Sequence, residues 1–260
     1  MRFHTFRDSI LKKIGIKKRL QVVCLWYILS LMVPTRKHTL TFASELSGKG
    51  KERFSDFLRN NRQVCEYTLE NLSKKEAERY TGVLKAAKRV SHLHVLLLID
   101  ATIQGRSSLK SENVQKFNHG KGYVIGHQWT NILLILNGTK MIPLPPIPFR
   151  SKKYCRKNRL EYKTEHERVI GYINKLNLYD YIGWHKEENV IVLTDSGYDG
   201  KHIQKAVLNK GWHFISALKV SRGIKTEEKY AQTSKASGWD GVGAFFRNHR
   251  RIGWETVRIF

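Results

Sequence analysis

The pattern of apolar and polar positions divides the chain into a helical first part and a strand-rich second part. Residues 17–32 form one apolar run that predicts a helix, and Pro34 follows it, a residue that cannot continue a helix. Residues 40–46 and 49–61 repeat apolar side chains three or four positions apart, on either side of Gly48. The spacing predicts two short helices joined by a turn, then a polar helix over residues 73–88.

The second part alternates between strand-like and helix-like runs. Asn137-Gly138 is a strong hairpin turn between two of the strands, and the longer of them has room for a bulge or bend around Gly126. We expect strands at residues 95–99, 122–136, 140–144, 190–193 and 213–218, and helices at 164–176 and 201–209. An antiparallel start followed by α/β alternation predicts an α/β fold, a mixed sheet with helices on its faces.

These patterns of apolar and polar positions predict three regions. Residues 1–90 form a small all-α region, residues 91–218 the α/β core, and residues 219–260 a stretch rich in Gly, Lys and Trp. Within the core, residues 143–148 hold four prolines and predict a stiff connection between a strand and the next helix.

Two of the apolar runs are each followed by an aspartate. Residues 94–99 lead into Asp100, and residues 189–194 lead into Asp195. A carboxylate at the carboxyl end of a buried strand is a common way to build an active site on an open α/β sheet. The alternative for either residue alone is a strand-end cap or a turn residue.

The balance of charge indicates the class of partner. The chain has 260 residues with 47 Lys and Arg against 22 Asp and Glu, a formal net charge of +25. An excess of this size is typical of proteins that bind nucleic acid. Another anionic partner, such as ribosomal RNA or an anionic membrane, is the alternative.

Two clusters of cations are candidates for DNA contact. The second of the two short helices could be the recognition helix of a helix-turn-helix, and a plain helical hairpin with a solvated basic face is an equal alternative. The second cluster follows the prolines and would track phosphates, unless it is a solvated loop. The helix contributes Lys51, Arg53 and Arg59, and the second cluster contributes Arg150, Lys152, Lys153, Arg156, Lys157 and Arg159.

Cysteine usage and hydropathy bear on the compartment. Cys24, Cys65 and Cys155 are far apart and form no C-x-x-C pair, so neither a zinc module nor a disulfide framework is expected. The apolar run at residues 22–33 is shorter than a spanning helix requires, and it lacks the features of a signal peptide. We therefore expect a cytoplasmic, nucleoid-associated protein that does not enter a membrane.

Several motifs together resemble a known family. Leu-Ile-Asp100-Ala-Thr102, Gly-His-Gln128 and Leu-Thr-Asp195-Ser-Gly-Tyr198-Asp-Gly200 look like the motifs of a DDE transposase of the IS4-like group. The resemblance implies a ribonuclease-H-like core, with the first catalytic Asp on the first strand and the second just after the fourth. Asp100 and Asp195 match these positions, and Asp199 is a weaker candidate. Residues 42–58 are similar to the end-binding helical region, so the resemblance covers most of the chain.

The implied chemistry is transfer of phosphodiester groups in DNA transposition. Two Mg²⁺ or Mn²⁺ ions can stabilise both the attacking and the leaving oxygen of an in-line displacement. Carboxylates are the hard oxygen ligands that such ions prefer. We therefore expect Asp100 and Asp195 to bind two divalent ions and to act on double-stranded DNA, with a homodimer on DNA as one arrangement.

The chain departs from the family pattern at the third acid. The resemblance implies a glutamate in a Tyr-x-x-Arg-x-x-x-Glu pattern, which this sequence lacks. Glu227, Glu228 and Glu255 are weak candidates, and residues 219–260 resemble the start of the β-rich insertion that precedes the family's glutamate. We expect a C-terminally truncated chain whose enzymatic activity is undecided. An inactive DNA-binding remnant and an unrelated ribonuclease-H-like nuclease are the alternatives.

Overall fold

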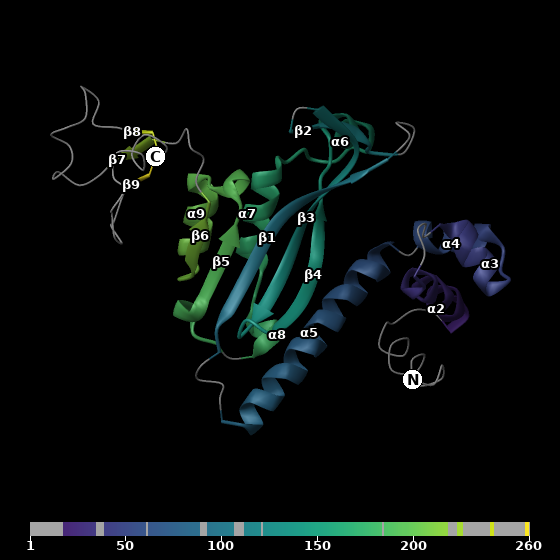
Figure 1. The fold of residues 1–260 in the computed structure, drawn as a ribbon, viewed down its shortest axis with the longest axis horizontal. Helices are drawn as coiled ribbons and strands as arrows, with labels where there is room; N and C mark the ends of the chain where they lie inside the picture. The colour runs from purple at the N-terminus through teal and green to yellow at the C-terminus, as the bar shows by residue number, and fades with distance from the viewer. Residues whose placement is uncertain are drawn as a thin grey trace. The chain divides into compact units, whose positions relative to one another are not determined.

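A computed structural model describes residues 18–34, 39–60, 62–88, 93–106, 112–120, 122–183, 185–217, 223–225, 240–241 and 258–259 (Figure 1). The chain divides into two compact units. The first comprises Met1–Val83 with Asp180–Gly183, and the second comprises Leu84–Tyr179 with Trp184–Phe260.

The first unit is helical. Its helices are α2 (Lys18–Met32), α3 (Leu40–Ser47), α4 (Lys51–Asn60) and α5 (Arg62–Ala86), whose last residues belong to the second unit. The apolar side of α2 packs with Ala43 of α3 and with Phe54 and Phe57 of α4 into one buried cluster. The predicted helical region is confirmed, but the third predicted helix begins well before residue 73, because α5 starts at Arg62.

The turn between α3 and α4 has the predicted form. Gly48 has φ of 65°, the left-handed conformation that glycine adopts at little cost. Ser44 Oγ donates to the carbonyl of Lys49 at 2.6 Å, and Thr39 caps α3 by accepting from the Phe42 amide at 3.1 Å. These contacts fix the turn between α3 and α4, and both the helix-turn-helix and the plain helical hairpin agree with them. The role of α4 in DNA binding stays a prediction.

The second unit is built on a six-stranded mixed sheet. Its strands are β1 (Val95–Gly105), β2 (Gln115–His119), β3 (Gly122–Leu136), β4 (Lys140–Pro148), β5 (Val190–Thr194) and β6 (His213–Ser216). They are ordered β2-β3-β1-β5-β6, and β4 also pairs with β3. Strand β1 is antiparallel to β3 and parallel to β5, and β6 continues the parallel half. This order confirms the ribonuclease-H-like mixed α/β sheet.

Short helices follow the strands. In the second unit they are α6 (Lys152–Lys157), α7 (Glu165–Lys175) and α9 (Lys201–Leu208), with 3₁₀ turns η3 (Glu187–Asn189) and η4 (Ser196–Tyr198). Helix α8 (Tyr179–Ile182) belongs, apart from Tyr179, to the first unit. Glu165 at the start of α7 accepts hydrogen bonds from Gln128 and Thr130 of β3, which places α7 on the face of β3 that carries these two residues. We call this the helix face. It holds the core, where Leu97, Ile99, Leu134, Ile142, Val192, Ile173 and Val207 are almost completely buried.

The structure corrects four expectations about the strands and loops. Strand β1 does not end at Asp100 but continues to Gly105, and β2 was not predicted. The proline segment is part of β4, which tolerates prolines because β4 pairs with β3 alone and so has a free edge. Part of the basic cluster after it forms a helix, α6, rather than a loop.

Gly126 joins β3 closely to its neighbours without a bulge. It pairs with Gly105 of β1 and with Gln115 of β2, and the β1–β3 register runs unbroken through it. A Cβ at this position would clash with the backbone carbonyl of Gln104. Glycine is therefore required by close backbone approach. The irregularity lies instead between Thr130 and Ile132, opposite β4.

The described part of residues 219–260 is a second, small sheet. It consists of β7 (Gly223–Lys225), β8 (Asp240–Gly241) and β9 (Arg258–Ile259), in the order β8-β7-β9. The three-region division and the interpretation of this stretch as an insertion stay predictions. Within the described residues, Cys24 and Cys155 are buried and form no disulfide. None of the helices described is long and apolar enough to cross a bilayer.

Candidate active site on the sheet

Strand pairing brings the two predicted aspartates together. Strands β1 and β5 are parallel neighbours, and the last residues paired in the register are Ile99 and Thr194. The residues that follow, Asp100 and Asp195, therefore lie side by side where β5 ends and β1 continues. Asp195 directly follows the end of β5, whereas Asp100 lies within its strand and not at its end.

Asp100 faces away from α7 and α9. Side chains alternate along β1, so Val95, Leu97 and Ile99 are buried on the helix face while Leu98, Asp100 and Thr102 are exposed on the other. We call this second side the open face. Asp100 is paired with Asn131 of β3, whose amide donates to Thr102 Oγ1 at 2.8 Å. Asn131 was not singled out from the sequence, because the β1–β3 register is set by tertiary pairing.

Asp195 has a structural role as well. Its Oδ1 accepts the backbone N–H of Gly197 at 2.9 Å and so caps η4, while its backbone carbonyl accepts from Ser216 Oγ at 2.8 Å. The cap that was an alternative to a catalytic role is therefore present. It uses one carboxylate oxygen, so the two roles are compatible.

A buried hydrogen-bond network holds the turn that carries Asp195. Tyr198 is 3% exposed, and its hydroxyl donates to the carboxylate of Glu165. The same carboxylate accepts from Thr130 Oγ1 at 3.2 Å and from Gln128 Nε2 at 2.8 Å. The turn is thus tied to both α7 and β3. Burial, together with the Glu165 carboxylate, raises the pKa of Tyr198 far above its ordinary range, so the phenol stays protonated.

A histidine supports the same turn from α7. His166 Nε2 donates to the carbonyl of Gly197 at 2.8 Å, and its ring lies 5.8 Å from the Tyr198 ring. Glu165 and His166 were both missed by the sequence interpretation. The signal available was their position at the first turn of a helix that Thr164 and Glu167 begin with a capping box.

The described residues offer two carboxylates at this site and no third one. They contain no group of three or more His, Cys, Asp or Glu side chains that could hold a metal ion. Glu165 lies on the helix face, so the sheet separates it from Asp100. Asp199 is buried at the end of η4. Glu227, Glu228 and Glu255 lie outside the described residues.

The predicted basic residues lie on or beside the short helices α4 and α6. Lys152, Lys153, Arg156 and Lys157 are exposed on α6, flanked by the partly buried Arg150 and the exposed Arg159. Asn113 ties this segment to β2: its Nδ2 donates to the carbonyl of Phe149, and its Oδ1 accepts from the Ser151 amide. In the first unit, Lys51, Arg53 and Arg59 are exposed on α4. Both sets are accessible, and whether they contact DNA stays a prediction.

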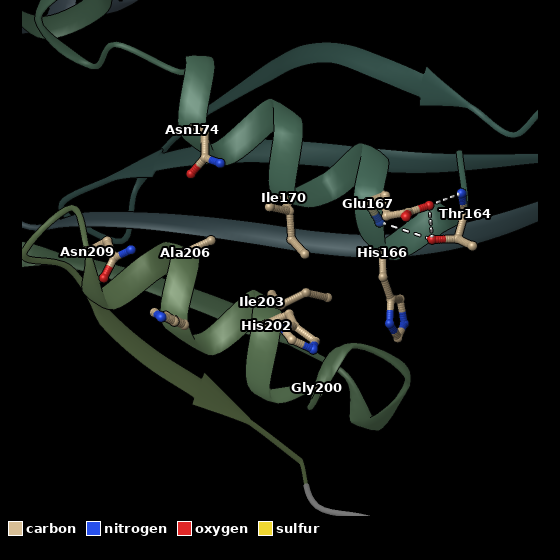
Figure 2. A pocket seen from close by; sticks show the side chains of 11 residues that line it. Thr164, His166, Glu167, Ile170, Asn174, Gly200, His202, Ile203, Ala206 and Asn209 are labelled. Atoms are coloured by element: carbon tan, nitrogen blue, oxygen red, sulfur yellow. Dashed lines mark hydrogen bonds between the residues drawn. The ribbon is translucent and has the colours of Figure 1, made fainter. Parts of the chain in front are cut away.

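A cleft of about 580 Å³ lies between α7 and α9. Figure 2 shows His166, His202, Ile170 and Ile203 along it, with Thr164 and Glu167 joined in the capping box at one end. Its lining includes neither Asp100 nor Asp195. The cleft is therefore distinct from the paired carboxylates.

Comparison with known proteins gives a weak structural likeness to a transposase. The sequence matches no protein-family model and no curated protein. Among solved structures, the chain is similar to the Mos1 transposase paired-end complex with left transposon end, at 13% identity and a TM-score of 0.24, over 77% of this chain and 59% of that one. The chain is similar to the same degree to the Mos1 strand transfer complex, at 12% identity and a TM-score of 0.24, over 78% of this chain and 60% of that one. It is also similar to a pre-cleavage Mos1 transpososome, at 11% identity and a TM-score of 0.22, over 78% of this chain and 61% of that one.

The chain thus spans about three fifths of the length of these transposase structures. TM-scores this low carry no argument about function, and they do not distinguish the IS4-like group from other transposases. The assignment of the fold rests on the strand order described above.

Proposed function

We propose that this chain carries the core of a DNA transposase of the IS4-like group, which cleaves and joins DNA strands by metal-dependent phosphoryl transfer. The observation that supports it most directly is the parallel pairing of Ile99 in β1 with Thr194 in β5, the residues that directly precede Asp100 and Asp195. The formal charge of +25 fits a polyanionic substrate. The partner is double-stranded DNA, with two copies of the chain on DNA as one arrangement.

The donor set fits a hard divalent cation. Magnesium is commonly held by one or two carboxylates, with water and substrate phosphate as its other ligands. Asp100 and Asp195 would hold Mg²⁺ or Mn²⁺, which when bound stabilises charge on the reacting phosphate oxygens. A second ion would need ligands beyond those that the described residues place here.

The residues of the chain have separate tasks in this proposal. Asp100 and Asp195 supply the negative charge of the cation site. The Glu165–Tyr198 hydrogen bond and the His166–Gly197 hydrogen bond fix the turn, so that the Asp195 carboxylate does not need to reorganise when the cation binds. Asn131 and Thr102 offer polar atoms next to Asp100 on the open face.

The test is nicking of supercoiled DNA by the full chain in Mg²⁺ or Mn²⁺, compared with Asp100→Asn and Asp195→Asn. Asparagine keeps the size of the side chain and can still accept the Gly197 amide, so the turn is retained while the charge is lost. We expect each variant to lose nicking almost completely. The matched control is Glu188→Gln, which removes an exposed carboxylate of the same unit.

Cation binding is read out separately by Mn²⁺ titration, followed by electron paramagnetic resonance. We expect weaker Mn²⁺ binding in both aspartate variants and no change in Glu188→Gln. Nicking that survives Asp195→Asn contradicts the site. A wild-type chain that binds DNA with steep salt dependence but does not nick it would instead support the DNA-binding remnant.

A further inference from the structure

Along β1, the open face changes from apolar to polar at Asp100. Before Asp100, β1 presents Leu96 and Leu98 on this face. From Asp100 onward, the alternate residues Asp100, Thr102 and Gln104 of β1 are polar and exposed, and so is Arg106, which directly follows the strand. A strand exposes alternate residues on one face, so these four side chains form a row that begins at the proposed cation site.

Neighbouring strands widen this row. Pairing places Asn131 beside Asp100 and His127 beside Gln104 on the same face, with Trp129 between them. Further along β3, Tyr123 is 56% exposed, and Lys116 of β2 lies over its ring at 3.7 Å from the centroid. We define the polar strip as Asp100, Thr102, Gln104, Arg106, Lys116, Tyr123, His127 and Asn131.

The cations of the strip are held in place. Arg106 donates from Nε to His127 Nδ1 at 3.5 Å and from Nη2 to Gln104 Oε1 at 3.2 Å. His127 in turn donates from Nε2 to the carbonyl of Glu112 at 2.8 Å. The Lys116 ammonium is positioned by its contact with Tyr123. None of these bonds involves a carboxylate, so both positive charges remain available to an anion.

The dimensions fit a nucleic acid duplex. Six residue steps from Asp100 in β1 to Arg106, directly after the strand, at roughly 3.3 Å each, give a row about 20 Å long. This is the rise of about six base pairs at about 3.4 Å per step along one strand. Carboxylates that would hold a cation lie at one end, and Arg106 and Lys116 lie toward the other.

We propose that double-stranded DNA lies along the polar strip on the open face, with its phosphates on Arg106 and Lys116 and one strand led to Asp100 and Asp195. This inference rests on the proposed function and names the surface that the substrate occupies. The Lys116 ammonium already lies over the Tyr123 ring, which favours backbone contacts over stacking of an unpaired base.

The strip is separate from the basic cluster on α6. Phe117 and Val124 lie on the other face of the β2–β3 pair, and Phe117 packs against Phe149, just before α6, with ring centroids 5.9 Å apart. Phe149, which directly precedes Arg150 and α6, therefore lies on the side away from Lys116 and Tyr123. The two surfaces can be tested independently.

The experiment measures binding of the full chain to a fluorescent 30-base-pair duplex across a salt series. The strip variant combines Arg106→Ala with Lys116→Ala. The α6 variant combines Lys153→Ala with Lys157→Ala, and the control variant combines Lys175→Ala with Lys186→Ala. Each of the three double variants loses two positive charges from exposed positions of the second unit. The salt slope is the steepness with which the logarithm of the binding constant falls with the logarithm of the salt concentration. Each lost phosphate contact on duplex DNA lowers it by about 0.9.

We expect the slope to fall by about 2 in the strip variant and to stay unchanged in the control. A fall in the strip variant supports the proposal whether or not the α6 variant also changes. An unchanged slope in the strip variant overturns it, while the proposed function stands if the wild-type chain nicks DNA. Tighter binding of single-stranded DNA of equal length would overturn the duplex as the occupant.

Direct contact is checked by photo-crosslinking. A benzophenone side chain at position 123 should crosslink to the duplex, and the same group at position 179, which is exposed outside the strip, should not. If position 123 does not crosslink and the strip variant keeps the salt slope of the wild-type chain, the duplex lies elsewhere.

Discussion

Burial decides how His185 titrates. The side chain is 4% exposed, its ring lies 4.5 Å from that of Tyr179, and its Nδ1 has no hydrogen-bond partner among the described residues. Burial lowers the pKa of His185 because the imidazolium would lose its hydration, and the Glu187 carboxylate partly opposes this. The residue is a neutral part of the core at neutral pH.

This environment predicts a pH dependence of stability. An unfolded histidine titrates near pH 6.5, and burial places the pKa of His185 in the folded state below that value. The unfolded chain therefore takes up the proton first, so the contribution is complete above about pH 6.5 and declines as the pH falls through 6.5 toward the lower pKa of the folded state. We expect His185→Phe to flatten the fall in unfolding free energy between pH 7 and 5, measured by urea denaturation. Glu187→Gln should extend the fall to lower pH, and an unaltered profile in both variants would contradict the assignment.

At the scale of elements, the short turn η4 depends on partners that are distant in the chain. Its own residues supply one capping bond, between Asp195 and the Gly197 amide. Further support comes from Glu165 and His166 of α7, from Thr130 of β3 and from Ser216 of β6. The geometry of the proposed site is therefore a property of the packed sheet and helix together.

Removing one hydroxyl from this network tests that dependence. Tyr198→Phe keeps the buried ring but leaves the Glu165 carboxylate short of a donor, which costs about 1–3 kcal/mol of unfolding free energy. Because the Asp195 turn loosens, we also expect Mn²⁺ affinity to fall about 10-fold or more. Tyr179→Phe, which changes an exposed tyrosine, is the control. Loss of stability without loss of Mn²⁺ affinity would show that the network does not position Asp195.

At the scale of the whole molecule, the two compact units have separate cores. The cluster of α2, α3 and α4 centres on Phe54, which is 0% exposed, while the sheet core is built from β1, β3, β5 and their helices. The excess of positive charge is spread over both units, including exposed cations of α4, α6 and the polar strip.

Separate cores predict separate unfolding. Phe54→Ala removes the largest buried side chain of the helical cluster and should cost about 3–5 kcal/mol there. We expect hydrogen exchange followed by mass spectrometry to show lost protection in α2, α3 and α4, with β1, β3 and β5 unchanged. Equal loss of protection in the sheet would mean that the units unfold together.

Most of the elements could be predicted because their signals are local. Each signal involves residues that are close together in the chain. This holds for the apolar runs, for the Asn137-Gly138 turn and for the spacing of apolar residues in α7 and α9. Strand β2 was missed because its residues are polar and gain their strand conformation from pairing with β3. The prolines of β4 suggested a linker because the sequence does not reveal that the strand has a free edge.

The sequence by itself determined the charge, the strand-forming runs and the two aspartates that follow them, because these depend on residue type and short-range order. Only the tertiary structure decided that Asp100 lies beside Asp195, that Asn131 faces Asp100, and that Glu165 reaches Tyr198. It also decided that alternate residues beyond Asp100 form an exposed strip. Register between distant strands is set by packing of the helix face, and a shift of one residue would turn every side chain to the other face.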